Sequence, residues 1–339
     1  MKTIRLGLLL LVVGSVLGGC NPNPANNVNN SNSANSNGGG APSKPFVVAI
    51  PTYPGFGIPY LAENKGFFKG MNVQLVRMDD SAAINAGMER GDIDACFTSV
   101  DSFVLLASAN IRSKAVLMSD ESKGADGIVA KKSIKDLAGL KGKKVAANLG
   151  WPGHFFLLYN LKKAGIPFGD VEITNLDADK AGAAFVSGTL DAAVTWEPWL
   201  SKATSAGNGG VLVSTATMPG VILDVMVVRD DSIANKQKEL QGFVNGYYQA
   251  LQAYNGDKAG SGAIIANALG LKPEDFAGMT QGFRFIEADE ASRLLAQGGQ
   301  VTSLFQTASD IWAEAKIIER PVGPGERTSS AFVDGYLKK

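Results

Sequence analysis

A glycine-rich loop, Gly150-Trp151-Pro152-Gly153-His154, runs directly into an apolar-faced helical pattern. At such a loop, free main-chain N–H groups meet the positive end of the helix dipole, and the glycines let a ligand approach the backbone closely. The pattern predicts an anion site formed by Trp151, Gly153 and His154, with a plain tight turn as the alternative. The Trp151 ring is expected either to line a pocket or to pack beneath one.

Two acidic residues lie where a positively charged ligand would be recognised. Glu197 stands between Trp196 and a proline, and a carboxylate beside indole rings suits a cationic or N–H-rich ligand. The alternative is an acid that favours the start of the following helix. Asp224 lies inside the apolar run 221–228, so its carboxylate needs a partner, either a ligand ammonium group or a main-chain capping interaction.

Other candidate ligand-binding residues follow the expected strands of the first half of the chain. Thr98 and Ser99 can donate hydroxyl hydrogen bonds to an anionic group. Asp80 and Asp101 can contact a ligand or cap a helix, and the cap is the preferred interpretation. The role of Asp126, just before an expected strand, is open. The remaining candidates are the aromatic residues Tyr53 and Phe56.

Short β-rich runs alternate with helical stretches from residue 46 onward, which is typical of an α/β fold with a largely parallel sheet. Two such sets, followed by a helical C-terminal third without strands, predict two lobes with a ligand cleft at the carboxyl ends of the strands. Residues 45–127 and 225–339 are assigned to the first lobe and 128–224 to the second. The expected strands span 46–50, 73–78, 93–98, 115–118, 127–130, 144–147, 171–175, 192–196 and 221–228, of which 127–130 and 221–228 are the expected crossings.

Catalysis and metal binding find little support in the sequence. His154 is the single histidine, and the two cysteines and the carboxylates show neither metal-ligand spacing nor a Ser-His-Asp order. No phosphate-binding or dinucleotide-binding glycine motif is present. We therefore expect a binding protein rather than an enzyme, with no cofactor and no metal. The 32 basic and 32 acidic residues give no footprint of a nucleic-acid partner.

The N-terminal residues predict export. Residues 1–19 carry basic residues, an apolar run and then small residues, as a secretory signal peptide does, and the apolar run is too short to span a bilayer. The segment that ends at Cys20 is similar to the lipid-attachment signal of bacterial lipoproteins, with an ordinary signal peptide as the alternative. Residues 20–44 are then a lipidated cysteine and a disordered Asn/Ser/Gly-rich tether. We expect the protein to be lipid-anchored to the cell-envelope membrane, facing the periplasm or the cell exterior.

Five segments occur in a fixed order: IPYLAENKGFFKG, GADGIVAK, LAGLKGKKVAANLGWPGHFFLLYNLKKAGI, DAAVTWEPWL and ILDVMVVRDD. In this order they resemble the solute-binding proteins of ABC importers of the nitrate, sulfonate and taurine type. The resemblance implies a periplasmic-binding-protein fold of the second type, with two α/β lobes, two hinge crossings and a ligand trapped by hinge closure. It also implies partners: a small-molecule solute, a permease and its ATPase subunit. We expect a monomer.

Within that family the chain is most similar to taurine-binding and aliphatic-sulfonate-binding members. The resemblance implies that residues 150–154 supply amides to an anionic head and that an acid at the position of Asp224 meets an amine. Thr98 and Ser99 match a hydroxyl pair at the end of the third strand in those members. An amino-sulfonate-like or other nitrogen-bearing solute is therefore expected.

The sequence also departs from the taurine pattern, at Trp151, Glu197 and Asp80. The excess of carboxylates over basic pocket residues disfavours a bare anion and favours a zwitterion, a cation or a neutral amide. The alternatives are a thiamine-precursor pyrimidine, a guanidine- or urea-like compound, and a sensor lipoprotein that does not transport. Pyrimidine-synthesising enzymes share the expected fold, but they need a cysteine-rich motif and histidines that this chain lacks.

Overall fold

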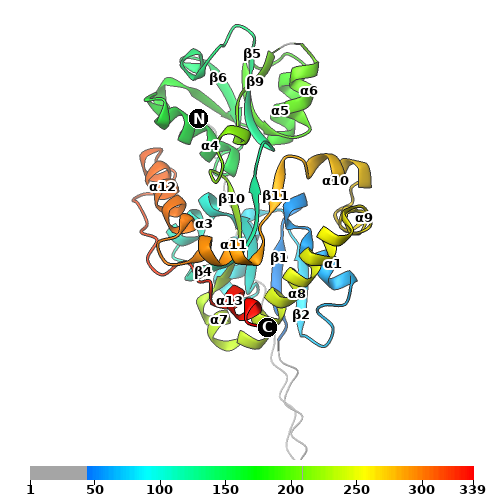
Figure 1. The fold of residues 1–339 in the computed structure, drawn as a ribbon. Helices are drawn as coiled ribbons and strands as arrows, with labels where there is room; N and C mark the ends of the chain where they lie inside the picture. Colours follow the sequence, from blue (N-terminus) through cyan, green and yellow to red (C-terminus); the bar gives the residue numbers. More distant parts are fainter. Residues whose placement is uncertain (1–43, 208) are drawn as a thin grey trace, which may run out of the picture. The chain divides into compact units, whose positions relative to one another are not determined.

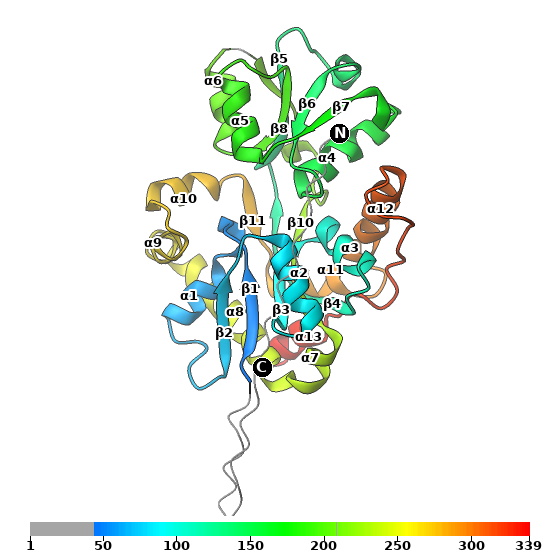
Figure 2. The same cartoon turned by 180° about the vertical axis from the view of Figure 1, so that it is seen from behind.

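The computed structural model describes residues 44–207 and 209–339. The predicted signal peptide, Cys20 and the tether up to residue 43 lie outside these residues. Two mixed α/β sheets, each with its own helices, form two lobes (Figures 1 and 2). Among the described helices, none has the length and apolar character needed to cross a membrane.

The first sheet holds six strands in the order β11-β4-β10-β3-β1-β2. β1, β2 and β3 are parallel, whereas β10 runs antiparallel to both β3 and β4. The central strands read as continuous apolar runs because helices cover both faces of this sheet. The strands are β1 (Phe46–Ile50), β2 (Val73–Arg77), β3 (Ala95–Ser99), β4 (Ser113–Ser122), β10 (Leu223–Arg229) and β11 (Phe283–Phe285).

The helices of the first lobe pack aromatic side chains onto this sheet. Phe243 of the long helix α8 is fully buried, stacks on Phe68 at 5.0 Å between ring centroids and contacts Phe46 and Phe97. Truncation of such a ring costs about 3–5 kcal/mol, so this cluster anchors α8. The helices are α1 (Ile58–Asn64), α2 (Ser81–Arg90), α3 (Val100–Ser108), α7 (Asp230–Asn235), α8 (Gln237–Gly256), α9 (Lys258–Leu269), α10 (Pro273–Met279), α11 (Ala288–Leu295), α12 (Gln300–Glu314) and α13 (Ala331–Leu337), with one 3-10 turn at Pro54–Phe56.

The second sheet holds five strands in the order β7-β6-β8-β5-β9, with β5 antiparallel to both of its neighbours. Helix α4 starts directly after β6 and α6 directly after β8, which places both helix starts at the carboxyl ends of parallel strands. The elements are β5 (Asp126–Lys131), β6 (Lys144–Ala147), α4 (Pro152–Lys163), β7 (Glu172–Asn175), α5 (Ala178–Val186), β8 (Ala192–Trp196), α6 (Trp199–Ser205) and β9 (Gly209–Ser214), with 3-10 turns at Leu137–Leu140, Phe168–Asp170 and Thr215–Thr217.

The chain passes between the two sheets twice, and the two passages are hydrogen-bonded to each other. The outgoing passage joins β4 to β5 through residues 123–125, and the return passage joins β9 to β10. The Gly124 N–H donates to Thr215 Oγ1 (2.7 Å), and the Ser122 and Thr215 hydroxyls lie 2.8 Å apart. The predicted crossing segments 127–130 and 221–228 fall in β5 and β10, where they belong to the second and the first sheet. The exact lobe boundaries remain a prediction.

Several local expectations were wrong. The C-terminal third contains a strand, β11, and β9 was not expected. β11 is only three residues long and β9 begins with two glycines, which are depleted in strands, so neither carries a strong pattern. The fourth strand extends to Ser122 rather than ending at Met118.

Candidate functional site

The carboxyl ends of β1, β3 and β4 meet the start of β10 at one edge of the first sheet, directly before the outgoing passage. Asp224 at the start of β10 pairs in register with Ser99 at the end of β3. Tyr53 follows β1, and its phenol donates to Asp120 Oδ1 at 3.3 Å near the end of β4. The convergence predicted for these strand ends is therefore present.

Four carboxylates gather at this edge: Asp101, Asp120, Asp224 and, at the first residue of β5, Asp126. The first three are 1%, 0% and 5% exposed, and Asp126 is partly buried. We define these four residues as the acidic cluster. In residues 44–207 and 209–339, no member of the cluster forms an ion pair with Lys, Arg or His.

Burial is the largest cause that raises the pKa of every carboxyl group in the acidic cluster. It raises the pKa of Asp101 and Asp120 to about 7 and that of Asp126 to about 6. The pKa of Asp224 is also raised, first by burial and then by the nearby charges of Asp120 and Asp126. The Asp120 and Asp224 carboxyl groups hydrogen-bond each other, which requires a proton between them. Without a ligand, the cluster therefore holds protons near neutral pH.

Hydroxyl groups satisfy part of the hydrogen-bonding capacity of the carboxylates in the acidic cluster. Ser122 Oγ donates to Asp126 Oδ2 at 2.6 Å, and Ser119 Oγ lies 2.9 Å from Asp120 Oδ2. Ser102 Oγ donates to Asp101 Oδ2 at 3.3 Å and accepts from Ser99 Oγ. Each hydroxyl can give only one hydrogen, so the remaining carboxylate lone pairs are available to donors on a ligand.

Aromatic rings hold Tyr53 in place over this edge. Phe56 lies edge-on at 5.0 Å, and Phe283 of β11 lies at 5.7 Å between ring centroids. Burial, followed by the charges of Asp120 and Asp224, raises the pKa of Tyr53, so the phenol stays protonated and remains a donor. Gly55 lets its loop come this close, because a Cβ there would collide with the Asp120 carboxylate and the Tyr53 ring.

The predicted anion loop lies in the second lobe. Trp151 is the N-cap residue of α4 without a side-chain cap, and Pro152 has no N–H group. The N–H groups of Gly153 and His154 have no acceptor among the described residues, so the helix start offers two donors. His154 is 3% exposed, and its Nδ1 accepts from the Gly150 N–H at 3.2 Å. Burial lowers the pKa of His154 to about 4, so its ring is neutral near pH 7.

Three tryptophans of the second lobe, Trp151, Trp196 and Trp199, are partly exposed. Trp151 makes no ring contact with any other aromatic side chain in the described part of the chain. Trp196 pairs in register with Asp126 across β8 and β5, so the two side chains project from the same face of the sheet. The Trp196 indole is fixed because its Nε1 donates to Asp179 Oδ1 at 2.6 Å, and Trp199 donates to the same oxygen.

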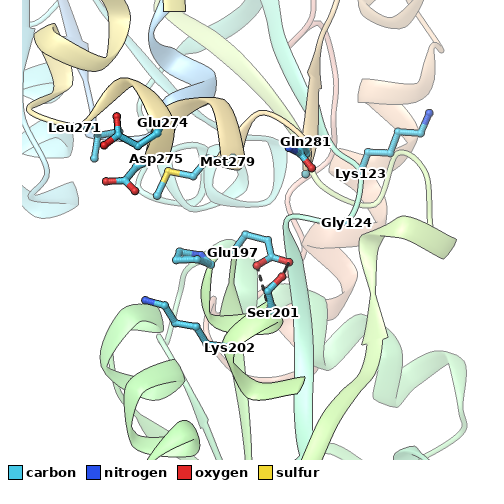
Figure 3. A pocket seen from close by; sticks show the side chains of 13 residues that line it. Lys123, Gly124, Glu197, Ser201, Lys202, Leu271, Glu274, Asp275, Met279 and Gln281 are labelled. Atoms are coloured by element: carbon cyan, nitrogen blue, oxygen red, sulfur yellow. Dashed lines mark hydrogen bonds between the residues drawn. The ribbon is translucent and has the colours of Figure 1, made fainter. Parts of the chain in front are cut away.

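Glu197 lies at the start of α6, where its carboxylate accepts from the N–H and the hydroxyl of Ser201 at 3.2 and 3.0 Å. The alternative of an acid at a helix start is therefore what the structure shows. Glu197 also lines a cavity of about 600 Å³ between α6 and α10 (Figure 3). Lys202, Glu274 and Asp275 line the same cavity. The carboxylate next to Trp196 thus faces this cavity and not the acidic cluster.

The remaining residues predicted to bind the ligand lie in different environments. Asp80 is exposed and caps α2, accepting from the N–H groups of Ala82 and Ala83, as the helix-cap interpretation expected. Asp101 lies inside the first turn of α3, whose N-cap is Ser99, so it is not a cap. Thr98 and Ser99 alternate across β3, and only Ser99 is bonded to the Asp101 network. The ligand roles of all these residues remain predictions.

Asp120 was missed by the sequence reasoning. The strand was expected to stop at Met118, which left Ser119-Asp120-Glu121-Ser122 without an assigned position. A signal was available, because polar residues directly after an apolar strand marked the ends of the other strands as well. Applied to the fourth strand, the same rule selects Asp120.

The model of the NMT1-like family matches residues 51–270. The chain belongs to the NMT1-like family. The resemblance expected from the five segments is confirmed at the level of the family. A putative aliphatic sulfonates-binding protein of Escherichia coli is 27% identical over 59% of this chain. The taurine-binding periplasmic protein of Escherichia coli is 25% identical over 73% of this chain. The matched regions span 61% and 79% of those two proteins.

Solved structures confirm the fold of this NMT1-like protein. The periplasmic aliphatic sulphonate binding protein SsuA from Escherichia coli superposes with a TM-score of 0.71 at 21% identity, covering 85% of this chain and 92% of that one. The expected two-lobed periplasmic-binding-protein fold is therefore correct. The desulfurization enzyme DSZB has a TM-score of 0.62 at 15% identity, covering 87% of this chain and 99% of its own, so the fold also occurs in an enzyme.

Proposed function

We propose that this NMT1-like protein is the extracytoplasmic solute-binding component of an ABC importer. It captures a small nitrogen-bearing organic solute and delivers it to a permease and its ATPase subunit. One observation carries this proposal: the acidic cluster takes three carboxylates from the elements of the first sheet and Asp126 from β5 of the second sheet, so a single ligand bound there would contact both. The sulfonate- and taurine-binding relatives support the same class of function.

A ligand that contacts both lobes shifts the population toward the conformer in which the lobes enclose it. Asp126 is suited to this role, because it starts β5 immediately after the outgoing passage and accepts from Ser122 at the end of β4. Lipid attachment at Cys20 would hold the binding protein at the membrane beside its permease.

The test is a calorimetric and thermal-shift screen of the purified chain with taurine, alkanesulfonates, nitrate, guanidine, urea and pyrimidines. We expect one class to bind saturably with a 1:1 stoichiometry, and X-ray scattering to show a smaller radius of gyration with ligand. Saturable binding without compaction would contradict a capture mechanism that involves both lobes. No binding in any class, or chemical conversion of the solute, would overturn the proposal.

A further inference from the structure

The acidic cluster lacks the positive charge that would balance its carboxylates, and we expect a ligand to supply that charge. A buried carboxylate is stable only with a positive or hydrogen-donating partner, and the cluster has four carboxylates with no cationic side chain bonded to them among the described residues. The basic residue at this edge, Arg284, is paired with Glu121 and Glu290, whereas Lys236 is paired with Asp94 at the opposite end of the sheet. The lack of a cationic partner is therefore specific to the carboxylates at this edge of the sheet.

Asp224 supplies an observation that is separate from the number of acids. Its side chain is 5% exposed, and no N–H group or hydroxyl from residues 44–207 or 209–339 donates to it. Among the described residues, the side chain has one hydrogen-bonding partner, the carboxyl group of Asp120, itself fully buried. A carboxyl group buried at the start of an apolar strand, with another carboxyl group as its partner, points to a donor that arrives with the ligand.

We propose, on the basis of the proposed function, that the solute is a compact organic cation with several N–H donors, of the guanidinium or amidinium class. Such a cation spreads one charge over a planar fork of N–H groups that matches carboxylate geometry in pairs. The proton shared by Asp120 and Asp224 leaves to the solvent when the cation enters, so positive charge replaces positive charge. The ring of Trp196, in register with Asp126 on the same face of the second sheet, offers a flat face for the same cation.

A sulfonate or another anion fits this site poorly. The predicted anion loop offers an anion two free N–H groups at the start of α4, and a helix start carries roughly half a positive charge. His154 adds nothing to it, because the neutral imidazole already accepts from Gly150. A divalent metal is also a poor fit, since no three His, Cys, Asp or Glu side chains in the described part of the chain are arranged to hold one.

The test is calorimetry of the full chain at pH 7.5 with methylguanidinium, acetamidinium, methylammonium, taurine, methanesulfonate and calcium as separate probes. We expect methylguanidinium and acetamidinium to bind at least about tenfold more tightly than methylammonium, which lacks the planar fork. We also expect the cations to release protons on binding, seen as a binding enthalpy that changes with the ionisation enthalpy of the buffer. Asp120→Asn should weaken the binding of methylguanidinium by about 100-fold. The matched control Asp92→Asn, at an acid 65% exposed, should leave the affinity unchanged within about twofold.

The outcomes separate this inference from the proposed function. Tighter binding of taurine or methanesulfonate than of any cation overturns the inference and leaves solute capture intact. Binding of calcium with no organic cation also overturns it, whereas binding of no solute at all overturns both. If Asp120→Asn does not fold, Asp224→Asn and the proton release of the unaltered chain decide the question. Cation binding without proton release contradicts the exchange at Asp120 and Asp224.

Discussion

The acidic edge of the first sheet and the helix start of the second differ in the kind of polarity that they present. At the acidic edge, ionisable side chains are buried and incompletely satisfied, and their protonation follows pH. At the helix start of α4, the polar groups are main-chain amides, and the one ionisable residue, His154, is neutral and already bonded. Full charges attract at longer range than amide dipoles, so we expect the carboxylates of the first lobe to determine the sign of the ligand's charge.

The two regions are also built differently along the chain. The helix start of α4 is one continuous segment, residues 150–154, and it contributes neutral donors. The paired carboxyl groups of the acidic edge come from separate elements, at the end of β4 and the start of β10.

The largest expected effect concerns Asp224. Asp224→Asn removes a charge from the ligand side and should weaken binding of a guanidinium-type cation by about 100-fold, or about 2.7 kcal/mol. The same change should raise the melting temperature of the unliganded protein, because it removes repulsion from Asp120 and Asp126. Calorimetry and thermal unfolding measure the two effects. Binding and stability that fall together would instead make Asp224 a structural residue.

The pH dependence of stability sharpens the same comparison. The pKa of Asp101 and Asp120 is about 7 in the folded protein, above the ordinary value of 3.8, so the folded state binds more protons than the unfolded state between these values. Their contribution to stability is complete below pH 4 and is lost as the pH rises toward 8. We expect each of the two carboxyl groups to cost the unliganded protein about 2–3 kcal/mol of unfolding free energy between pH 5 and 8.

At the helix start of α4, the contribution of His154 to stability depends on pH with the opposite sign. Its folded pKa of about 4 lies below the ordinary 6.5, so its contribution is lost as the pH falls through that interval. Denaturant titrations of the unaltered chain, of Asp120→Asn and of His154→Gln separate the two. A stability difference between Asp120→Asn and the unaltered chain that does not change with pH would contradict the raised pKa of Asp120.

A smaller effect is expected at Trp151. Its ring is partly exposed and has no aromatic contact among the described residues, so Trp151→Ala should weaken the ligand by about tenfold while the melting temperature changes little. The matched control is Trp312→Phe, at a fully buried indole that donates to the main-chain oxygen of Asp101 at 2.9 Å. That change should cost about 1–2 kcal/mol of stability. A large loss of stability in Trp151→Ala would make its ring part of the core.

The smallest expected effect is at an ion pair between the lobes. Lys162 of α4 lies 2.6 Å from Glu314 of α12, with side chains 45% and 51% exposed. Exposed pairs contribute about 0–1 kcal/mol, so Lys162→Ala should change ligand affinity by less than about threefold. Calorimetry in 0.05 and 0.5 M sodium chloride measures this change in affinity, which should disappear at the higher salt concentration. A tenfold change in affinity would show that the contact between α4 and α12 controls the closure of the lobes around the ligand.

Much of the fold could be predicted from the sequence, because buried parallel strands leave continuous apolar runs such as β1 and β8. β9 and β11 could not, since glycines and a three-residue length remove that pattern. Within the site, Asp224 was identifiable as an acid in an apolar strand. Asp120 could be found as a polar residue that follows an apolar strand, but its approach to Asp224 could not, because that depends on the pairing of β4 with β10, and pairing has no local signature. For Glu197, the direction of the side chain was undetermined until α6 was placed.

Trp312 gives the protein a built-in optical reporter. Its indole extends from α12, donates to the main chain of Asp101 in the first lobe, and lies 5.2 Å from the His154 ring and 6.0 Å from the Phe155 ring in the second. It has no exposed surface, so any movement that separates α4 from α12 admits water to this one indole. Emission from a buried indole shifts to the red when water reaches it. The intrinsic fluorescence of the unlabelled protein can therefore follow the movement of its lobes in real time.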